Sequence, residues 1–427
     1  MINGKKAILI LGAISAMNEI VIDAKKMGYY VIVTDYLEDS PAKKYADETW
    51  MFSIDDVDSI VDKCKERNVD GVMNYCIDPG QKPYQQICEK LNLPCISGYK
   101  QFDIMTNKDK FALCCLEHGL DVIPKYNLGK NITSKDYESL EYPIMIKPVD
   151  GRASKGIIVV EKPADMDSAI EYSLQFSKRK EVIIEKYLKC PEFCAKYVAS
   201  NGNIYFSSMS DVWDSVLPDG TRVYMGTSSY PSKYYEEYLK TTNNKVIEML
   251  KDIGIKNGAM SLTGFYDNGH FRFFDPSLRM GGAQDWRIVE AACGINIANL
   301  LTNFAMTGSM GNDDEIKKID CAFSKKCSAL LYYDLLLGKI GRIDGIDEIL
   351  KLPGVHGYHQ CHKVGDTIES FGTANSVAIR FIVSCNTKEE FVSTVKAANK
   401  LMVIEDINGN NMIAPKYNPE LFLNSDK

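Results

Sequence analysis

Residues 1–101 alternate between short apolar runs typical of buried strands and amphipathic stretches typical of helices. The runs with strand character are residues 7–11, 30–34, 71–74 and 94–97, and the stretches with helical spacing are residues 17–27, 57–67 and 84–91. A strand, a helix and a second strand in this order form a βαβ unit, which predicts a parallel sheet with a right-handed crossover. We therefore predict one doubly wound α/β domain over residues 1–101.

Beyond residue 101 the pattern changes to hairpins mixed with helices. Helical spacing covers residues 107–118, 166–177, 233–253, 285–307 and 388–402, and strand-like runs cover residues 142–147, 156–161, 181–185 and 377–384. Two further pairs of runs enclose the turn sequences Asn201-Gly202-Asn203 and Asp267-Asn268-Gly269. Such turns between strand-like segments predict β-hairpins.

The bulk composition bounds the class of protein. The chain has 427 residues, 45% hydrophobic and 25% charged, with a net charge of -7, and this length predicts two to four packed modules. No block of lysine and arginine stands out, so nucleic acid is disfavoured as a partner. No stretch approaches the roughly 20 apolar residues of a membrane span. The thirteen cysteines, without a secretory signal, indicate reduced thiols and a cytoplasmic protein.

A dinucleotide site is disfavoured in the first βαβ unit. Such a site needs three glycines, because they let the backbone approach a pyrophosphate. Here Gly12 stands alone. We interpret Gly12 as a turn glycine and Asp35, which ends the second strand, as a residue that caps a substrate cleft.

A lysine and a small-residue loop follow the strand-like run at 142–147. Lys147 ends that run, and residues 151–156 read Gly-Arg-Ala-Ser-Lys-Gly. A lysine in a buried strand should face an anion, and a loop of this composition, which includes Ser154 and Gly156, can fold its N–H groups over phosphates. The alternative is an exposed lysine at a strand end.

A second charged segment follows residues 181–185. The strand ends at Glu185, the chain continues Lys186-Tyr187-Leu188, and Glu192 lies seven residues after Glu185. A connector of this kind can pair its backbone with a flat heterocycle, and the later carboxylate can accept both hydroxyls of a ribose. Taken alone, the segment is better interpreted as a strand that ends in solvated charges.

A third segment places an acid and an arginine after an aromatic strand. Residues 273–279 read Phe-Phe-Asp-Pro-Ser-Leu-Arg, and Gly281 and Gly282 follow. Asp275 suits Mg²⁺, which is usually held by one or two carboxylates together with phosphate oxygens. Arg279 suits a carboxylate or an acyl phosphate through its planar fork. The alternative is a structural ion pair between Asp275 and Arg279.

Together and in this order, these segments resemble the ATP-grasp superfamily over residues 6–311. Residues 185–193 are most similar to its D-alanine ligase branch, and the Gly-Gly pair to its carboxylate–amine ligase and carbamoyl-phosphate-synthase-like branch. The resemblance implies that ATP is bound by Lys108, Lys147, Ser154, Gly156, Glu185, Lys186, Tyr187, Leu188 and Glu192. It implies that Mg²⁺ is bound by Asp275 and Ser277, and that Arg279 and Lys147 act on the reacting groups.

The resemblance also implies the fold class, α/β combined with α+β. It divides the chain into an N-terminal doubly wound parallel α/β domain (1–101), a central split ATP-grasp domain (102–320) and a small mixed C-terminal α+β module (321–427). The flap of the central domain is expected over about residues 123–188.

The activity implied is that of an ATP-dependent ligase. It would phosphorylate a small-molecule carboxylate to an acyl phosphate and couple it to an amine, releasing ADP and phosphate. The acceptor pocket is expected between loops of the first domain and residues 210–230, a segment that holds Asp211, Trp213, Asp214, Arg222 and Tyr224. That segment is equally well interpreted as an ordinary excursion at the domain edge. A homodimer is left open.

Two alternative functions are compatible with the same residues. The first is activation of bicarbonate or glycine, as in carbamoyl-phosphate synthase or phosphoribosylglycinamide synthetase. The second is a nucleotide-binding protein that has lost catalysis, because Ser277 replaces an asparagine common in the superfamily and residues 261–263 offer no second metal carboxylate.

A cluster of histidines near residue 360 is interpreted as structural. His356, His359, Cys361 and His362 lie close together but lack CxxC pairs and a second ligand group at zinc-finger spacing. A structural or surface role is therefore favoured over a metal site.

Overall fold

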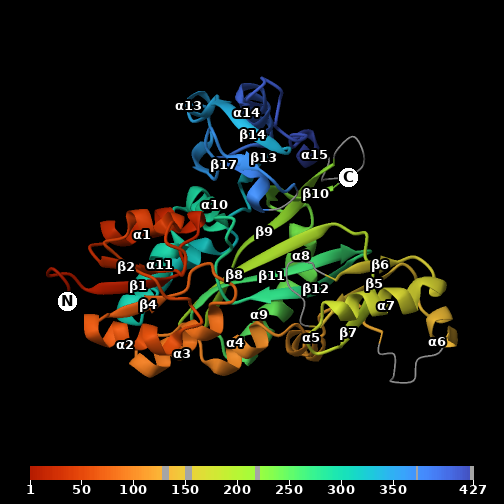
Figure 1. The fold of residues 1–427 in the computed structure, drawn as a ribbon, viewed down its shortest axis with the longest axis horizontal. Coiled ribbons are helices and arrows are strands. Elements are labelled where there is room, and N and C mark those ends of the chain that lie inside the picture. The colour runs from red at the N-terminus through yellow and green to blue at the C-terminus, as the bar shows by residue number, and fades with distance from the viewer. Residues whose placement is uncertain (127–133, 150–155, 217–221, 372–373, 424–427) are drawn as a thin grey trace.

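A four-stranded parallel sheet forms the N-terminal lobe, at the red end of the chain in Figure 1. The computed structural model describes residues 1–126, 134–149, 156–216, 222–371 and 374–423. The strands lie in the order β3-β2-β1-β4, with bounds β1 Ala7–Leu11, β2 Tyr30–Thr34, β3 Glu48–Trp50 and β4 Gly71–Met73. Helices α1 (Asn18–Lys26), α2 (Val57–Arg67), α3 (Gln81–Leu91) and α4 (Tyr99–Met105) complete the lobe. Every residue of β1 is fully buried, as expected of a parallel sheet covered on both faces.

The strand predicted at residues 94–97 is not formed. Pro94 has no N–H to offer a sheet, and the Ile96 N–H donates to the Tyr84 hydroxyl at 3.3 Å. The segment is therefore held by a side chain of α3 rather than by a neighbouring strand, and the prediction of a fifth strand was wrong.

A small antiparallel sheet with its own core forms a second lobe. Its strands β5 (Ile144–Pro148), β6 (Ile158–Val160) and β7 (Val182–Lys186) lie in the order β6-β5-β7. Helices α6 (Ser134–Glu138) and α7 (Met166–Gln175) belong to this lobe. Ile144 and Ile146 pack there against Met166 and Ile184. This lobe occupies the position along the chain where the flap is expected.

An eight-stranded sheet joins the centre of the chain to its C-terminal part. The order is β12-β11-β8-β9-β10-β13-β17-β15. Its bounds are β8 Glu192–Ser200, β9 Asn203–Val216, β10 Arg222–Tyr230, β11 Gly258–Asp267, β12 His270–Ser277, β13 Cys327–Asp334, β15 Val355–Gln360 and β17 Val377–Cys385. Both predicted hairpins are present, as β8–β9 and β11–β12. Strands from beyond residue 321 thus extend the central sheet.

The long helix predicted over residues 233–253 is broken in two, and the helical stretch predicted over residues 285–307 consists of two helices. Residues 233–253 form α8 (Tyr235–Thr241) and α9 (Asn243–Ile253), separated at Thr242. Threonine and asparagine are weak helix formers, and Tyr197 donates from its hydroxyl to Asn243 Oδ1 at 2.9 Å, which fixes the break. Residues 285–307 form α10 (Asp285–Cys293) and α11 (Ile297–Thr307), and these two helices are bent by 102°.

Of the remaining elements, α5 (Lys108–Glu117) packs on α4, α9 and β12, and the others lie in the C-terminal part or on the way to it. They are α12 (Asp313–Ile316), α13 (Ile346–Ile349), α14 (Lys388–Leu401), α15 (Glu420–Leu423), β14 (Gly338–Asp344), β16 (Thr367–Ile368) and β18 (Val403–Asp406). α14 packs on β17 and β13 over a second hydrophobic core. Within the described ranges no single helix has the length and apolar character to cross a membrane, although α10 and α11 taken together do.

Candidate functional site

Lys147 and Glu185 form a buried ion pair in the small sheet. Met145 lies opposite Glu185 in the β5–β7 register, which places Lys147 diagonally across from Glu185 on the same face. The Lys147 ammonium contacts Glu185 Oε1, and the two side chains are 20% and 4% exposed. Because a buried charge is costly without a partner, the pair explains how a lysine can end this strand. The more exposed member, the ammonium, is the one that a phosphate could reach.

The connector after β7 is fixed by its neighbours. The Lys186 N–H donates to the Pro124 carbonyl oxygen and the Tyr187 N–H donates to the Pro143 carbonyl oxygen, each at 3.0 Å. The Lys186 ammonium forms an ion pair with Glu141 Oε2 at 2.8 Å. Leu188 is buried. The segment predicted to bind a heterocycle is therefore a rigid edge.

Two further expected nucleotide contacts lie on neighbouring segments of the chain, before β6 and at the start of β8. Glu192 begins β8, where it lies opposite Phe265 of β11. Gly156 has a φ of +77°, and a Cβ there would lie 2.7 Å from the Phe176 Cβ, so only glycine suits this position. Ser154, together with the rest of residues 150–155, lies outside the described residues.

Asp275 and Lys108 form an exposed ion pair between β12 and α5. The Lys108 ammonium lies 2.8 Å from Asp275 Oδ1, with side chains 55% and 48% exposed. Lys108 is the first residue of α5, whose N-cap Asn107 accepts from the Asp109 and Lys110 N–H groups. Exposed pairs contribute at most about 1 kcal/mol, so both charges can exchange partners when an anion or a cation enters.

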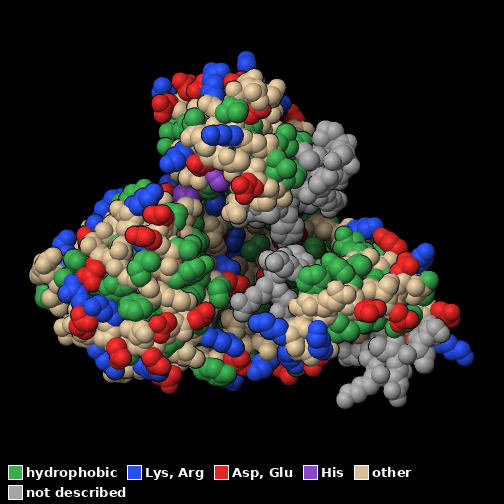
Figure 2. All heavy atoms as spheres, viewed as in Figure 1, with side chains coloured by type: hydrophobic (Ala, Val, Ile, Leu, Met, Phe, Trp, Pro, Cys, Tyr) green, Lys and Arg blue, Asp and Glu red, His purple; other side chains and the backbone are tan. Residues whose placement is uncertain are grey.

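One short segment brings these two ion pairs together. Lys125 forms a β-bridge with Glu185, and Val122 forms one with Phe273, two residues before Asp275. Three residues of extended chain span about 10 Å at most, so this segment links β7 to β12 over a short distance. The Lys125 ammonium also contacts Asp109 of α5. The surface is hollowed where the lobes meet, and Lys and Arg side chains are visible within the hollow (Figure 2).

Arg279 contacts an acid of the N-terminal lobe that sequence reasoning missed. Its Nε donates to Asp78 Oδ1 at 3.0 Å and its Nη1 donates to the Met280 carbonyl oxygen at 2.8 Å. The Ser277 hydroxyl, in a buried side chain, donates to the same Asp78 oxygen at 3.4 Å. Asp78 follows β4, at the carboxyl end of a parallel strand. Ligands bind at this end of open α/β sheets, so the position of Asp78 could have identified it from the sequence.

Asp275 and Arg279 do not pair with each other. Asp275 pairs with Lys108, and Arg279 pairs with Asp78. The structural Asp275–Arg279 pair considered above is therefore not the arrangement observed.

A second missed residue, Lys196 of β8, lies in the interior beside Arg279. Its ammonium lies 3.3 Å from Asp285 Oδ2 and donates to the Tyr230 hydroxyl at 3.2 Å. Burial, the largest single effect, lowers the pKa of Lys196, but the Asp285 carboxylate together with Tyr230 and Cys194 outweighs it, so the pKa lies well above its usual range. Lys196, Asp285 and Arg279 line a cavity of about 20 Å³, which has room for one water molecule.

The segment 210–230 has structural contacts where it is described. Asp211 accepts from the Ser232 hydroxyl at 2.6 Å and from the Lys233 N–H at 2.9 Å. Trp213 donates from its indole to Ser229 Oγ at 2.6 Å. The side chains of Asp214, Arg222 and Tyr224 are outside the described residues.

The histidine cluster makes contacts with backbone and acids. His356 Nε2 lies 3.1 Å from the Ser384 carbonyl oxygen, and buried His359 lies 3.6 Å from Glu19 Oε1. Among the described residues, no group of three or more His, Cys, Asp or Glu side chains is arranged to hold a metal ion.

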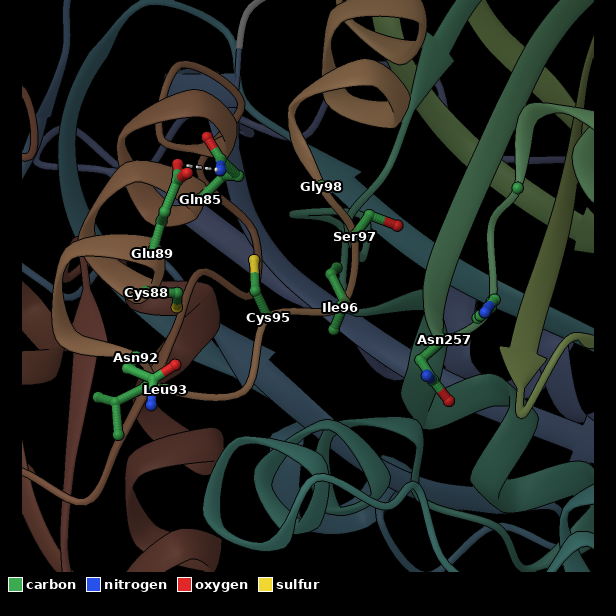
Figure 3. A pocket seen from close by; sticks show the side chains of 12 residues that line it. Gln85, Cys88, Glu89, Asn92, Leu93, Cys95, Ile96, Ser97, Gly98 and Asn257 are labelled. Carbon is green, nitrogen blue, oxygen red and sulfur yellow. Dashed lines mark hydrogen bonds between the residues drawn. The ribbon is translucent and has the colours of Figure 1, made fainter.

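A pocket at the base of the N-terminal lobe is separate from these residues (Figure 3). It has a volume of about 480 Å³ and lies between the α3–α4 connection and the turn at residues 254–257. Gln85 donates to Glu89 Oε2 at 2.8 Å on its wall. None of the predicted site residues lines it.

Comparisons with known proteins bear on this arrangement. Residues 123–252 match the family model described as D-ala D-ala ligase C-terminus. The structure matches phosphoribosylglycinamide synthetase from Anaerococcus prevotii with a TM-score of 0.74 and 18% identity, covering 94% of this chain and 99% of that one. It matches L-amino acid ligase from Bacillus licheniformis with a TM-score of 0.73 and 20% identity, covering 94% and 98%. The chain has the ATP-grasp fold.

Two curated relatives match part of this ATP-grasp chain. Formate-dependent phosphoribosylglycinamide formyltransferase of Prochlorococcus marinus is 27% identical over 187 residues, which are 43% of this chain and 48% of that protein. An ATP-grasp enzyme of Aspergillus fumigatus is 27% identical over 170 residues, 38% and 29% of the two chains. The chain thus spans about half the length, or less, of the curated relatives it matches. The parallel N-terminal sheet and antiparallel central sheets agree with the predicted fold class.

Proposed function

We propose that this ATP-grasp chain is an ATP-dependent ligase that activates a carboxylate as an acyl phosphate and couples it to an amine. The observation that carries the proposal is the adjacency of the Lys147–Glu185 and Lys108–Asp275 pairs, joined through residues 122–125. The ammonium groups of Lys108 and Lys147 can bind the phosphates of a nucleoside triphosphate. The match of residues 123–252 to a ligase family model supports the same conclusion.

The chain's own residues can perform the first step by positioning and charge. A carboxylate oxygen of the acid attacks the γ-phosphorus of ATP, and ADP leaves. Lys108 and Lys147 stabilise the negative charge that spreads over the transferred group. Glu185, Lys186, Tyr187, Leu188 and Glu192 are proposed to hold the base and ribose, with Ser154 and Gly156 in the loop that covers the phosphates.

The residues around Asp275 fit Mg²⁺ in part. Its half-exposed carboxylate is a suitable ligand, and Mg²⁺ commonly needs only one or two protein carboxylates because phosphates supply the rest. The Ser277 hydroxyl is the proposed neutral ligand, although it is directed at Asp78. When bound, Mg²⁺ would neutralise charge on the transferred phosphoryl group. Lys108 must then leave Asp275, which their exposed contact permits.

Arg279 is proposed to hold the acyl phosphate for the second step. The amine nitrogen attacks the acyl carbon, the carbon–oxygen bond to phosphate breaks, and the amine loses a proton, giving an amide and phosphate. Arg279 is 18% exposed and already held by Asp78, so its planar fork is oriented before substrate arrives. Small-molecule substrates, a cytoplasmic location and a homodimer belong to the same proposal.

A second candidate is an ATP-binding protein without ligase activity. It is favoured by one observation: Thr263 lies opposite Asp275 in the β11–β12 register, so the neighbouring strand offers a hydroxyl rather than a second carboxylate. Activation of bicarbonate or glycine is a variant of the ligase proposal.

A screen of ATP-dependent phosphate release over pairs of carboxylates and amines tests the proposal. Bicarbonate and glycine are included among the acids. Release that needs both an acid and an amine supports the ligase. ATP binding by calorimetry without release for any pair supports the second candidate instead.

A further inference from the structure

A cavity of about 730 Å³ lies outside the carboxyl ends of the parallel strands in the N-terminal lobe. Its walls are the residues that follow each strand: 12–14 after β1, 35–41 after β2, 53–55 after β3, and Ile77 and Pro79 after β4. In the order β3-β2-β1-β4, the strands β2 and β3 lie on one side of β1 and β4 lies on the other, so the direction of the strand order reverses at β1. Open α/β sheets bind ligands at such a switch point.

The cavity borders the residues proposed for the second step. Ile77 and Pro79 of its wall flank Asp78, which holds Arg279. A Cβ on Gly282 would lie 3.9 Å from Ile14 Cδ1, another wall residue. An amine in the cavity would therefore approach the acyl group from the Arg279 side.

The groups that could bind a phosphate in this cavity are already engaged. The Ala13 N–H donates to Asp35 Oδ2 at 3.2 Å, and the Leu37 N–H donates to Asp35 Oδ1 at 2.9 Å. The buried Lys43 ammonium donates to the Asp35 carbonyl oxygen at 2.8 Å, so it is held by the backbone of the segment that follows β2. The Asp35 carboxylate thus occupies amides that a phosphate would need, and it would repel one.

The exposed charges of the cavity wall are all negative. Glu38, Asp39 and Asp55 are exposed, and in the part of the chain that the structure describes none of them forms an ion pair. The same wall, described throughout, contains no lysine or arginine. Free carboxylates of this kind favour a cation.

The same wall presents apolar surface. Ile14, Tyr36 and Leu37 are 39%, 66% and 53% exposed. An aliphatic chain can cover Ile14 and Leu37, and an exposed tyrosine ring such as that of Tyr36 can bind a cation over its face. Apolar contact and negative charge together describe a ligand with a hydrocarbon body and a positive end.

We propose that this cavity binds the amine substrate, and that this substrate is a cationic amine with an apolar body, of which a linear diamine is the simplest form. One amine lies toward Asp78 and Arg279, and the second, protonated amine lies among Glu38, Asp39 and Asp55. The assignment rests on the proposed ligase function. It excludes a phosphorylated amine, because the anion would meet carboxylates.

Binding of three matched probes tests the proposal without turnover. The probes are 1,5-diaminopentane, 1-aminopentane and 5-aminopentyl phosphate, measured by calorimetry with the full chain, both without nucleotide and with a non-hydrolysable ATP analogue. We expect the diamine to bind roughly fivefold more tightly than the monoamine, with the difference reduced by salt. Tightest binding of the aminoalkyl phosphate, or equal binding of all three under both conditions, overturns the proposal.

Charge-neutralising variants locate the effect. Glu38→Gln combined with Asp39→Asn should lower diamine affinity roughly threefold to tenfold and should lower monoamine affinity less. Asp62→Asn, an exposed acid on α2 away from the cavity, is the matched control and should change neither. An unchanged diamine affinity in the double variant overturns the assignment.

Phosphate release separates this inference from the ligase proposal. If phosphate is released in an acid-dependent way with 5-aminopentyl phosphate but not with the diamine, the cavity assignment is wrong and the ligase proposal is retained. If the diamine binds selectively but no acid gives phosphate release, the ligase proposal is wrong and the cavity is retained as a diamine site.

Discussion

Removal of the Lys147 ammonium should affect stability and nucleotide binding separately. In Lys147→Met the Glu185 carboxylate, 4% exposed, loses its partner. Removing one member of a buried pair costs about 3–5 kcal/mol, and because Lys147 is one-fifth exposed we expect the lower end, about 3 kcal/mol. Loss of a charge-assisted contact to phosphate costs about 1.5–3 kcal/mol. ATP affinity should therefore fall roughly tenfold to a hundredfold.

A double variant tells the two effects apart. Lys147→Met with Glu185→Gln removes both charges, so the free energy of unfolding in urea should return to within about 1 kcal/mol of the unmodified protein. ATP affinity by calorimetry should stay low. Glu185→Gln alone keeps the ammonium, so it separates loss of the carboxylate from loss of the ammonium and should weaken ATP binding less than Lys147→Met does. Recovery of full ATP affinity in the double variant would refute a phosphate contact by Lys147.

Three further changes have distinct expected outcomes. Asp275→Asn should depress phosphate release at least a hundredfold while ATP affinity by calorimetry changes less than about tenfold, because the carboxylate acts on transition-state charge; equal losses would contradict this. Arg279→Lys should raise the KM for the acid roughly tenfold and leave ATP affinity alone, because the fork and not the charge is lost; an unchanged KM would count against the role. Burial raises the pKa of Asp334 to about 7 although Arg380 opposes the shift, so the folded state keeps a proton that the unfolded state releases above about pH 4. The unfolding free energy should thus fall by about 2–4 kcal/mol as pH rises from 4 to 7, and Asp334→Asn should flatten this slope in urea titrations; a slope that persists in the variant would contradict it.

Local pattern was enough where short-range chemistry decides the structure. The Asn201-Gly202 and Asn268-Gly269 turns predicted both central hairpins, because left-handed backbone at these positions fixes strand pairing. The alternation of apolar runs and helical spacing predicted the parallel lobe. These signals lie within a few residues of the structure that they determine.

Long-range contacts decided what the sequence could not show. The 94–97 run is as apolar as a strand, but the Tyr84 hydroxyl takes the Ile96 N–H. Asp78 joined the site only because the N-terminal lobe packs against Arg279, 201 residues later. The partners of Asp275 and Arg279 could not be read from their spacing, since each side chain pairs with a different element.

Transfer of oxygen from the acid to phosphate tests the central claim most directly. The full chain is incubated with ATP, a panel of carboxylic acids labelled with ¹⁸O in the carboxylate, and a panel of amines, and the released phosphate is analysed by mass spectrometry. Passage through an acyl phosphate predicts one ¹⁸O atom in each phosphate released, since the carbon–oxygen bond breaks when the amine attacks. Release of phosphate without label, or no release with any pair, would contradict the account.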